Sequence, residues 1–242
     1  MTTSRNPIFC AIDTTDVPRA AMLARTLGGG AVGGIKLGLE FFVANGPRGV
    51  AEVLPAGTDL FLDLKLHDIP NTVAGAVRAA SFLSPYLLTV HCAGGAAMMR
   101  AAADAATATA ADPARRTRII GVTVLTSLDD ADLAATGQAG PAADQARRLA
   151  LLARESRLDG VVCSPHEVAM LRAECGPGFL LVVPGIRPAG AALGDQKRVM
   201  TPAEAIAAGA DHLVIGRPIT EAPDPAAAAR AIRDGLGPQG RP

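Results

Sequence analysis

Residues 59–72 read Asp-Leu-Phe-Leu-Asp-Leu-Lys-Leu-His-Asp-Ile-Pro-Asn-Thr, which sets an apolar strand directly before a helix. A strand buried on both faces is almost wholly apolar, but this one carries charges where its apolar run ends. Asp63 and Lys65 are two residues apart, so a strand points both to one face, and Asp68 follows at the turn. Opposite charges a few ångströms apart interact by about 4 kcal/mol at an effective dielectric of about 20. Because such groups are costly to desolvate, the stretch predicts a functional site at a strand end.

The same strand-then-helix unit repeats along the whole chain. Short runs rich in Ile, Val and Leu occupy 8–12, 34–38, 59–65, 86–92, 118–124, 160–164, 180–185 and 212–216. Stretches with helical spacing lie at 17–27, 71–83, 95–109, 142–156, 165–175, 202–208 and 224–236. This alternation predicts parallel strands joined by right-handed crossovers.

The residues after the first strand distinguish between two parallel folds. An open doubly wound sheet usually has a Gly-rich phosphate loop there, whereas residues 12–16 read Ile-Asp-Thr-Thr-Asp. A (β/α)8 barrel commonly spans a length like these 242 residues as one domain. We therefore predict an α/β fold, a single-domain (β/α)8 TIM barrel over residues 1–236, with a disordered tail at 237–242.

Composition narrows the possible partners and the compartment. The 23 basic and 23 acidic residues cancel, aromatics make up 3% and Trp is absent, which argues against binding nucleic acid or an anionic membrane. The N-terminus is polar and no apolar run approaches a membrane span, so a cytoplasmic protein is expected. Cys10, Cys92, Cys163 and Cys175 lack metal-ligand spacing and are expected to be buried reduced thiols.

Polar residues at the predicted strand ends form the candidate site, because barrel enzymes place their chemistry there. They are Asp13, Lys36, Asp63, Lys65, Asp68, His91, Thr126, Arg187 and Arg217. The loops after strands seven and eight often hold a phosphate. In the last of these loops, Gly216 permits a close backbone approach and Arg217 offers a charge-assisted contact.

Some of these residues also have plain structural explanations. Asp13 could cap a helix, Lys36 could extend outward from a short strand, and His91 fits a hydrogen-bonded barrel residue better than a catalyst. The other three histidines show no convergent spacing. Lys65 is the hardest to explain in this way, because Asp63 shares its strand face and Lys36 enters the same mouth.

Together these residues resemble the orotidine 5′-phosphate decarboxylase family over nearly the whole chain. Residues 63–72 are similar to the family's Asp-x-Lys-x-x-Asp-Ile-Pro-Asn-Thr signature. Further matches are Val-Thr-Val-Leu-Thr-Ser at 122–127, Pro-Gly-Ile-Arg-Pro at 184–188, Gly-Asp-Gln at 194–196 and Val-Ile-Gly-Arg-Pro-Ile-Thr at 214–220. The resemblance implies decarboxylation of orotidine 5′-monophosphate to uridine 5′-monophosphate (UMP), the last step of de novo UMP synthesis, without metal or cofactor.

The chemistry of that reaction explains why the family needs fixed charges. Loss of carbon dioxide from an sp² ring carbon leaves a poorly delocalised carbanion, for which other decarboxylases use an organic electron sink. A lysine ammonium near the carbon can stabilise the anion and supply the proton. The resemblance gives this role at C6 to Lys65 and places Asp63 beside the departing carboxylate. Asp63 and Asp68 would stabilise the ammonium, and Lys36 completes the catalytic group.

The resemblance also implies binding roles. Lys36 and Asp13 would contact the ribose hydroxyls, and Thr126 the pyrimidine edge. The residues implied at the phosphate are Arg187, Gln196, Gly216 and Arg217, with residues 187–199 forming a lid.

A homodimer is implied in the same way. Asp68 and Thr72 resemble residues that reach into the neighbouring subunit's site, so that two sites are shared across a symmetric interface.

Two other functions stay open. Magnesium-dependent sugar-phosphate decarboxylases and aldolases of the same superfamily share Asp-x-Lys-x-x-Asp, but they typically place an acidic residue on strand two, where this chain has Lys36. A non-catalytic barrel that binds a phosphorylated ligand is the second, since fold does not imply function. Such a binder has no need of four clustered charges.

Overall fold

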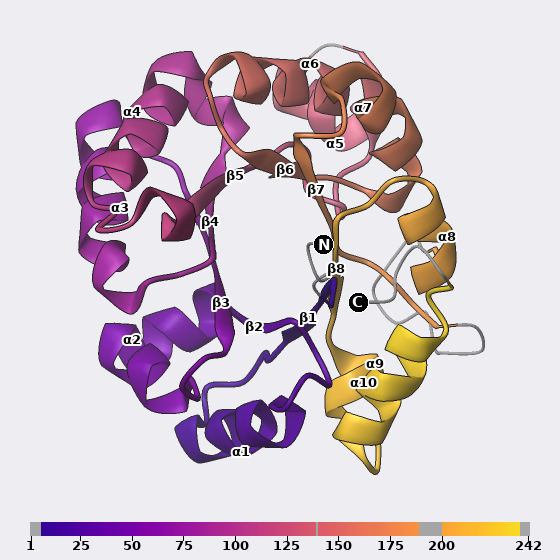
Figure 1. Ribbon diagram of the computed structural model, residues 1–242. Coiled ribbons are helices and arrows are strands. Elements are labelled where there is room, and N and C mark those ends of the chain that lie inside the picture. Colours follow the sequence, from indigo (N-terminus) through magenta and orange to yellow (C-terminus); the bar gives the residue numbers. More distant parts are fainter. Residues whose placement is uncertain (1–5, 139, 189–199, 238–242) are drawn as a thin grey trace.

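The chain folds into a closed barrel of eight parallel strands, which confirms the predicted architecture. The computed structural model describes residues 6–138, 140–188 and 200–237, and the strands follow one another around the barrel in chain order (Figure 1). They are β1 Ile8–Ala11, β2 Gly34–Gly38, β3 Asp59–Leu66, β4 Leu87–His91, β5 Arg118–Val122, β6 Gly160–Val162, β7 Leu180–Val183 and β8 His212–Ile215. Residues 238–242 of the tail predicted to be disordered lie outside the described residues.

Helices surround the strands. They are α1 Val17–Leu27, α2 Leu39–Val53, α3 Pro70–Ala80, α4 Gly95–Ala108, α5 Asp130–Ala135, α6 Ala142–Glu155, α7 Val168–Cys175, α8 Pro202–Ala207, α9 Arg217–Thr220 and α10 Pro225–Asp234. None of the helices in the described ranges combines the length and apolar character needed to cross a membrane.

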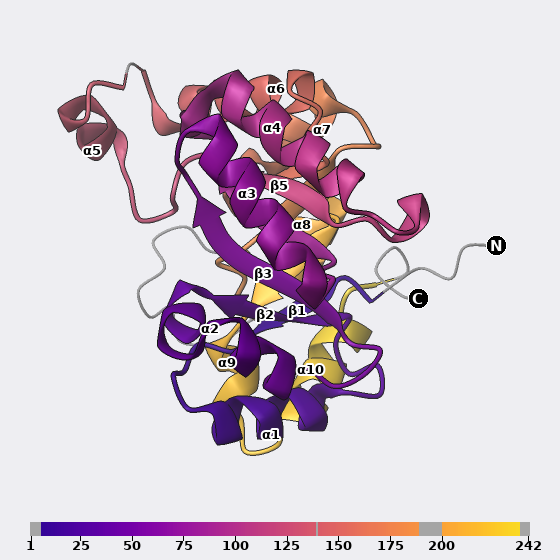
Figure 2. The same ribbon diagram turned by 90° about the vertical axis from the view of Figure 1, so that its left-hand side faces the viewer.

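Three helices are absent from the sequence prediction, and each has a local reason. In α2, Gly46 has a φ of 61° and is followed by Pro47, so the helical spacing is broken at a kink. The helices α5 and α9 have only 6 and 4 residues, too few to show a period. Figure 2 shows α5 standing apart from the ring of helices.

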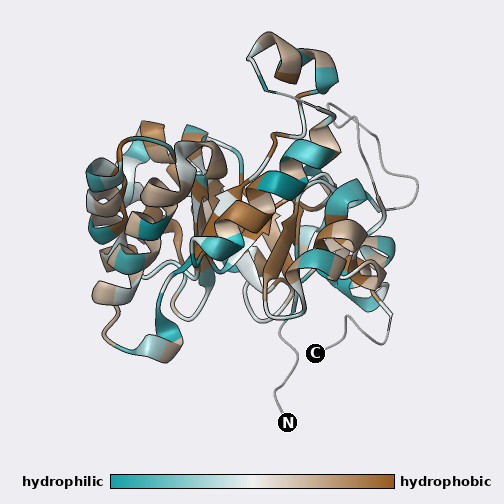
Figure 3. Cartoon of the chain, turned by 90° about the horizontal axis from the view of Figure 1, so that it is seen from above, coloured by the Kyte–Doolittle hydropathy of each residue, from teal (hydrophilic) through white to brown (hydrophobic). Residues whose placement is uncertain are grey.

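The apolar core has two parts, because each strand is covered on both faces. Helices pack against the outer face of the barrel, and in Figure 3 the largely brown strands lie among helices that carry both brown and teal residues. Inside, Phe9 meets Phe61 edge to face at 5.8 Å between ring centroids. Gly34 makes room for this packing, since a Cβ there would lie 2.3 Å from the Phe9 ring. The inside of the barrel below the carboxyl ends of the strands is therefore filled with side chains.

The pairing of β3 with β4 is irregular at the functional stretch. Leu62 pairs with Leu88 and Leu66 pairs with Val90, so residues 63–65 all lie opposite one residue of β4. Lys65 has a φ of 49°, in the left-handed region that non-glycine residues rarely adopt. The regular alternation expected for this strand is thus replaced by a bulge.

Candidate active site

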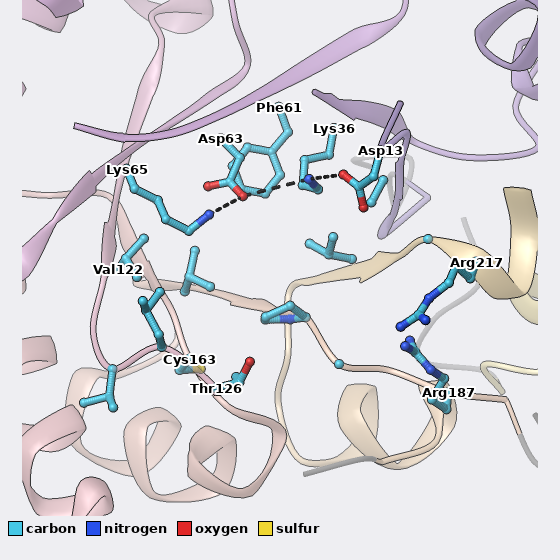
Figure 4. Close-up of a pocket in the computed structure, with 18 residues that line it drawn as sticks. Asp13, Lys36, Phe61, Asp63, Lys65, Val122, Thr126, Cys163, Arg187 and Arg217 are labelled. Carbon is cyan, nitrogen blue, oxygen red and sulfur yellow. Dashed lines mark hydrogen bonds and ion pairs between the residues drawn. The ribbon is translucent and has the colours of Figure 1, made fainter. Parts of the chain in front are cut away.

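A cavity of about 280 Å³ opens at the carboxyl ends of the strands (Figure 4). Eight of the predicted site residues line it, namely Asp13, Lys36, Asp63, Lys65, Thr126, Arg187, Gly216 and Arg217. They come from β2 and β3 and from the segments that follow β1, β5, β7 and β8. The barrel brings together residues separated by up to about two hundred positions, as expected for a site at the strand ends.

Charges of alternating sign form a row on one side of this cavity. Lys65 Nζ lies 2.8 Å from Asp63 Oδ2, Lys36 Nζ lies 4.0 Å from the same oxygen, and Lys36 Nζ lies 3.2 Å from Asp13 Oδ1. Lys36 is only 8% exposed, so its ammonium has lost most of its water. The two flanking carboxylates offset that desolvation.

The structure decides against the helix-cap explanation for Asp13 and the outward-pointing explanation for Lys36. Asp16 rather than Asp13 caps α1, because the Asp16 side chain accepts a hydrogen bond from the Arg19 amide. Lys36 points into the cavity instead of outward. Gly38 leaves room for it, since a Cβ at that position would lie 3.1 Å from Lys36 Nζ.

A residue that the sequence reasoning missed supports the row from behind. Thr89, in β4, is fully buried. Its hydroxyl donates to Asp63 Oδ1 at 2.9 Å and accepts from the Lys65 amide at 2.9 Å. A polar side chain inside the apolar run Leu-Leu-Thr-Val was the signal that could have identified it.

Two histidines lie beside the same strand ends. His91 is half-buried, and its Nδ1 accepts a hydrogen bond from the Ala93 amide at 3.3 Å, so it is hydrogen-bonded as the sequence suggested. Its ring stacks on that of His67 with centroids 5.3 Å apart, a contact that the spacing did not suggest. Burial, followed by the charges of His67 and Lys65, lowers the pKa of His91 below 6.5.

The apolar wall of the cavity was largely missed as well. It is formed by Ala11, Phe61, Val122, Val124, Leu125, Val162, Cys163 and Val214. Burial raises the pKa of the Cys163 thiol well above its usual value, so this thiol stays neutral. All four cysteines are free and buried, as predicted. An apolar wall lowers the local dielectric and strengthens the field of the charged row.

Two guanidinium groups occupy the side of the cavity away from the lysines. Arg187 and Arg217 point toward one another in Figure 4. Arg187 is 9% exposed, and its Nη1 donates to the Ile186 carbonyl at 3.0 Å. Two adjacent cations suit a ligand group with two negative charges. Gln196 and residues 189–199 of the expected lid lie outside the described residues.

Asp68 and Thr72 are not brought into this cavity by their own chain. Both are exposed, and neither lines the cavity. Asp68 Oδ1 accepts a hydrogen bond from the Ile69 amide at the start of α3. Within one chain, therefore, the second aspartate of the charged row is Asp13, whereas the resemblance assigns Asp68 to the neighbouring subunit's cavity.

Within residues 6–138, 140–188 and 200–237, no three His, Cys, Asp or Glu side chains are grouped so that they could hold a metal ion. Lys36 lies on β2, at the position where an acidic residue was expected for a magnesium-dependent enzyme of the superfamily.

Comparison with known proteins agrees with the fold. The sequence model of the orotidine 5′-phosphate decarboxylase/HUMPS family matches residues 6–232. The chain belongs to this family. The orotidine 5′-phosphate decarboxylase of Rhodospirillum rubrum is 61% identical over 235 residues, which cover 95% of this chain and 93% of that protein.

Other members of the family are similar over the same length. The Paramagnetospirillum magneticum orotidine 5′-phosphate decarboxylase is 56% identical over 237 residues, 96% of this chain and 99% of that protein. The crystal structure of the Lactobacillus acidophilus orotidine 5′-phosphate decarboxylase superposes with a TM-score of 0.84 at 36% identity, covering 96% of this chain and 99% of that one. The family match thus extends over all eight strands of the barrel.

Proposed function

We propose that this family member decarboxylates orotidine 5′-monophosphate to UMP and carbon dioxide, the last step of de novo UMP synthesis. The observation that carries the proposal is the row Lys65–Asp63–Lys36–Asp13, which lies across an apolar cavity from two arginines. A nucleotide with one phosphate and one carboxylate carries anionic groups at its two ends, and the cavity has cations at both ends.

The charged row supports specific catalytic roles. When the bond between C6 and the carboxylate breaks, the electron pair stays on C6 and carbon dioxide leaves. The Lys65 ammonium stabilises that pair and transfers its proton to C6, after which the neutral amine takes up a proton from solvent. Asp63, 2.8 Å from Lys65 Nζ, holds the ammonium in place and lies beside the departing carboxylate. No external electron acceptor enters this balance.

Substrate binding is divided between the two sides of the cavity. Lys36 and Asp13, joined at 3.2 Å, suit the ribose hydroxyls as donor and acceptor. Thr126 is placed for the pyrimidine edge. Arg187 and Arg217 hold the phosphate, with Gly216 and, in the segment outside the described residues, Gln196. The binding energy of the phosphate can offset the desolvation of the charged centre.

The active unit in this proposal is a symmetric homodimer in which Asp68 and Thr72 enter the neighbouring subunit's cavity. Apolar side chains are exposed close to them: Leu39 follows β2 and is 49% exposed, and Ile69 follows β3 and is 66% exposed. Val43, one turn beyond Leu39, is 79% exposed. An interface over this mouth would bury these side chains and carry Asp68 and Thr72 with them.

We place the protein in the cytoplasm. The four buried free thiols suit a reducing compartment.

Turnover of orotidine 5′-monophosphate by the purified protein, followed by its ultraviolet absorbance, tests the function. We expect a fall in absorbance that persists with excess chelator. Activity that requires added magnesium would favour the sugar-phosphate enzymes. Tight UMP binding without turnover would favour a non-catalytic barrel. Lys36 on β2 disfavours the former, and the complete charged row disfavours the latter.

A further inference from the structure

We propose that Thr89 is a positioning residue for both Lys65 and Asp63. This inference rests on the proposed function for its kinetic consequence, but the geometry behind it is independent of the substrate. Thr89 does not line the cavity. It acts through the two residues that do.

The first step concerns the bulge in β3. Residues 63–65 lie opposite Thr89 alone, because the pairing passes from Leu62–Leu88 to Leu66–Val90. A bulge of this kind disrupts the ladder and leaves backbone groups that need other partners. The Lys65 amide finds its partner in the Thr89 side chain, at 2.9 Å. A hydroxyl from β4 thus replaces a missing rung of the ladder.

The second step concerns the direction of the two hydrogen bonds. A threonine hydroxyl has a single proton and two lone pairs. It accepts from the Lys65 amide, so its proton is available for Asp63 Oδ1, also at 2.9 Å. The other oxygen of Asp63 is then left to face Lys65 Nζ at 2.8 Å. One buried hydroxyl therefore fixes the backbone that carries the lysine and the rotamer of the aspartate.

The third step concerns the backbone of Lys65. Its φ of 49° persists only where the surroundings determine it strongly. Without the hydroxyl, residues 63–65 lose a hydrogen bond that holds this conformation, and the Asp63 carboxylate is free to rotate. The ammonium would then no longer be held where the carbanion forms, although the arginines across the cavity would be undisturbed.

The test compares Thr89→Val, which keeps the shape and removes the hydroxyl, with Thr89→Ser, which keeps the hydroxyl. Thr123→Val is the matched control, because Thr123 is 1% exposed and donates to a backbone carbonyl, that of Val162, at 3.0 Å. We expect Thr89→Val to lower kcat for orotidine 5′-monophosphate by about 10- to 100-fold, by analogy with the loss of a hydrogen-bond partner behind a metal ligand. KM and the Kd for UMP should change by less than about threefold, since phosphate binding contributes to both.

Thr89→Ser should restore most of kcat, and Thr123→Val should leave kcat unchanged even if it lowers the melting temperature. The inference is overturned if Thr89→Val keeps wild-type kcat, if Thr89→Ser is as impaired as Thr89→Val, or if Thr123→Val lowers kcat equally. Each of these outcomes would reduce Thr89 to a structural residue.

Amide hydrogen exchange at Lys65, measured by NMR without ligand, separates this inference from the proposed function. The Lys65 amide should exchange at least about tenfold faster in Thr89→Val than in the unsubstituted protein, while the Leu62 amide keeps its rate. An unchanged Lys65 rate overturns the positioning role. If the unsubstituted protein does not turn over orotidine 5′-monophosphate, the proposed function fails, and the exchange rates still decide the role of Thr89.

Discussion

At the scale of the residue, Lys65 carries the largest share of the proposed chemistry. We expect Lys65→Ala to lower kcat by at least about 10⁴-fold, because it removes both the proton donor and the charge that stabilises the carbanion. Lys65→Met serves as a control that keeps most of the side-chain stem and removes the ammonium group. UMP binding and the melting temperature should show that both variants fold. Near-normal turnover in either variant would contradict the assignment.

Arg217 should matter for binding more than for the chemical step. A charge-assisted hydrogen bond contributes about 1.5–3 kcal/mol, so Arg217→Ala should weaken UMP binding by about 10- to 100-fold. Uridine, which lacks the phosphate, provides the control within the same calorimetric experiment, and its weaker affinity should not change. Equal losses for both ligands would mean that Arg217 acts on the shape of the cavity rather than on the phosphate.

His91 makes the stability of the protein sensitive to acid. Its pKa is lowered in the folded state by burial first and then by His67 and Lys65. Below pH 6.5 the unfolded chain therefore binds the proton more readily. The contribution of the neutral His91 to the free energy of unfolding is therefore fully present above pH 6.5. It is lost as the pH falls through the pKa of His91 in the folded state.

Replacing His91 should reduce this dependence. We expect His91→Asn to lessen the slope of unfolding free energy against pH just below pH 6.5, by at most about 1.4 kcal/mol per pH unit. His166, which is exposed, provides the matched control His166→Asn. Urea titrations at several pH values measure both, and identical slopes in the two variants would exclude His91 as the source.

At the scale of the element, one arginine ties three pieces of the barrel together. The Arg172 guanidinium, on α7, donates to the carbonyls of Gly176, Phe179 and Gly209 and forms an ion pair with Asp211. Asp211, which lies just before β8, in turn accepts a hydrogen bond from the Leu181 amide of β7 at 2.7 Å. The strands that precede the arginine-bearing loops are thus anchored at their amino ends.

Breaking this anchor should cost far more than breaking a surface pair. Arg172→Met leaves several partly buried acceptors without their donor, so we expect a loss of about 2–4 kcal/mol in unfolding free energy. The control is Asp104→Asn, which removes the exposed Arg157–Asp104 pair at 2.8 Å and should cost less than about 1 kcal/mol. Chemical denaturation of both variants provides the measurement. Similar losses would show that the Arg172 contacts are replaced by water at little cost.

At the scale of the whole molecule, the shared site can be tested by mixing subunits. If Asp68 completes the neighbour's cavity, a dimer with one Lys65→Ala subunit and one Asp68→Ala subunit has one site with both residues intact. Refolding the two inactive variants together at equal amounts should then restore about a quarter of normal activity. If both residues serve the same subunit's cavity, the mixture should stay as inactive as its components.

Sequence reasoning predicted the barrel well, because strand-helix alternation is a property of consecutive residues. It also predicted the acidic and basic residues of the cavity, since these interrupt apolar runs at strand ends. It did not predict Thr89 or the apolar wall around Val122 and Val162, because a side chain that faces a cavity has the same polarity as one that faces the core. The bulge at Lys65 also stayed hidden, because its register is set by pairing with β4 and not by β3 itself.

That bulge has a consequence for anyone who wishes to transplant this chemistry. Copying Asp63 and Lys65 onto a regular strand of another barrel would transfer the two residues without the backbone conformation that positions them. The portable unit is a strand pair, consisting of residues 62–66 with their surplus length and the β4 segment that carries Thr89. A designed host must therefore accept a longer third strand before it can accept the lysine.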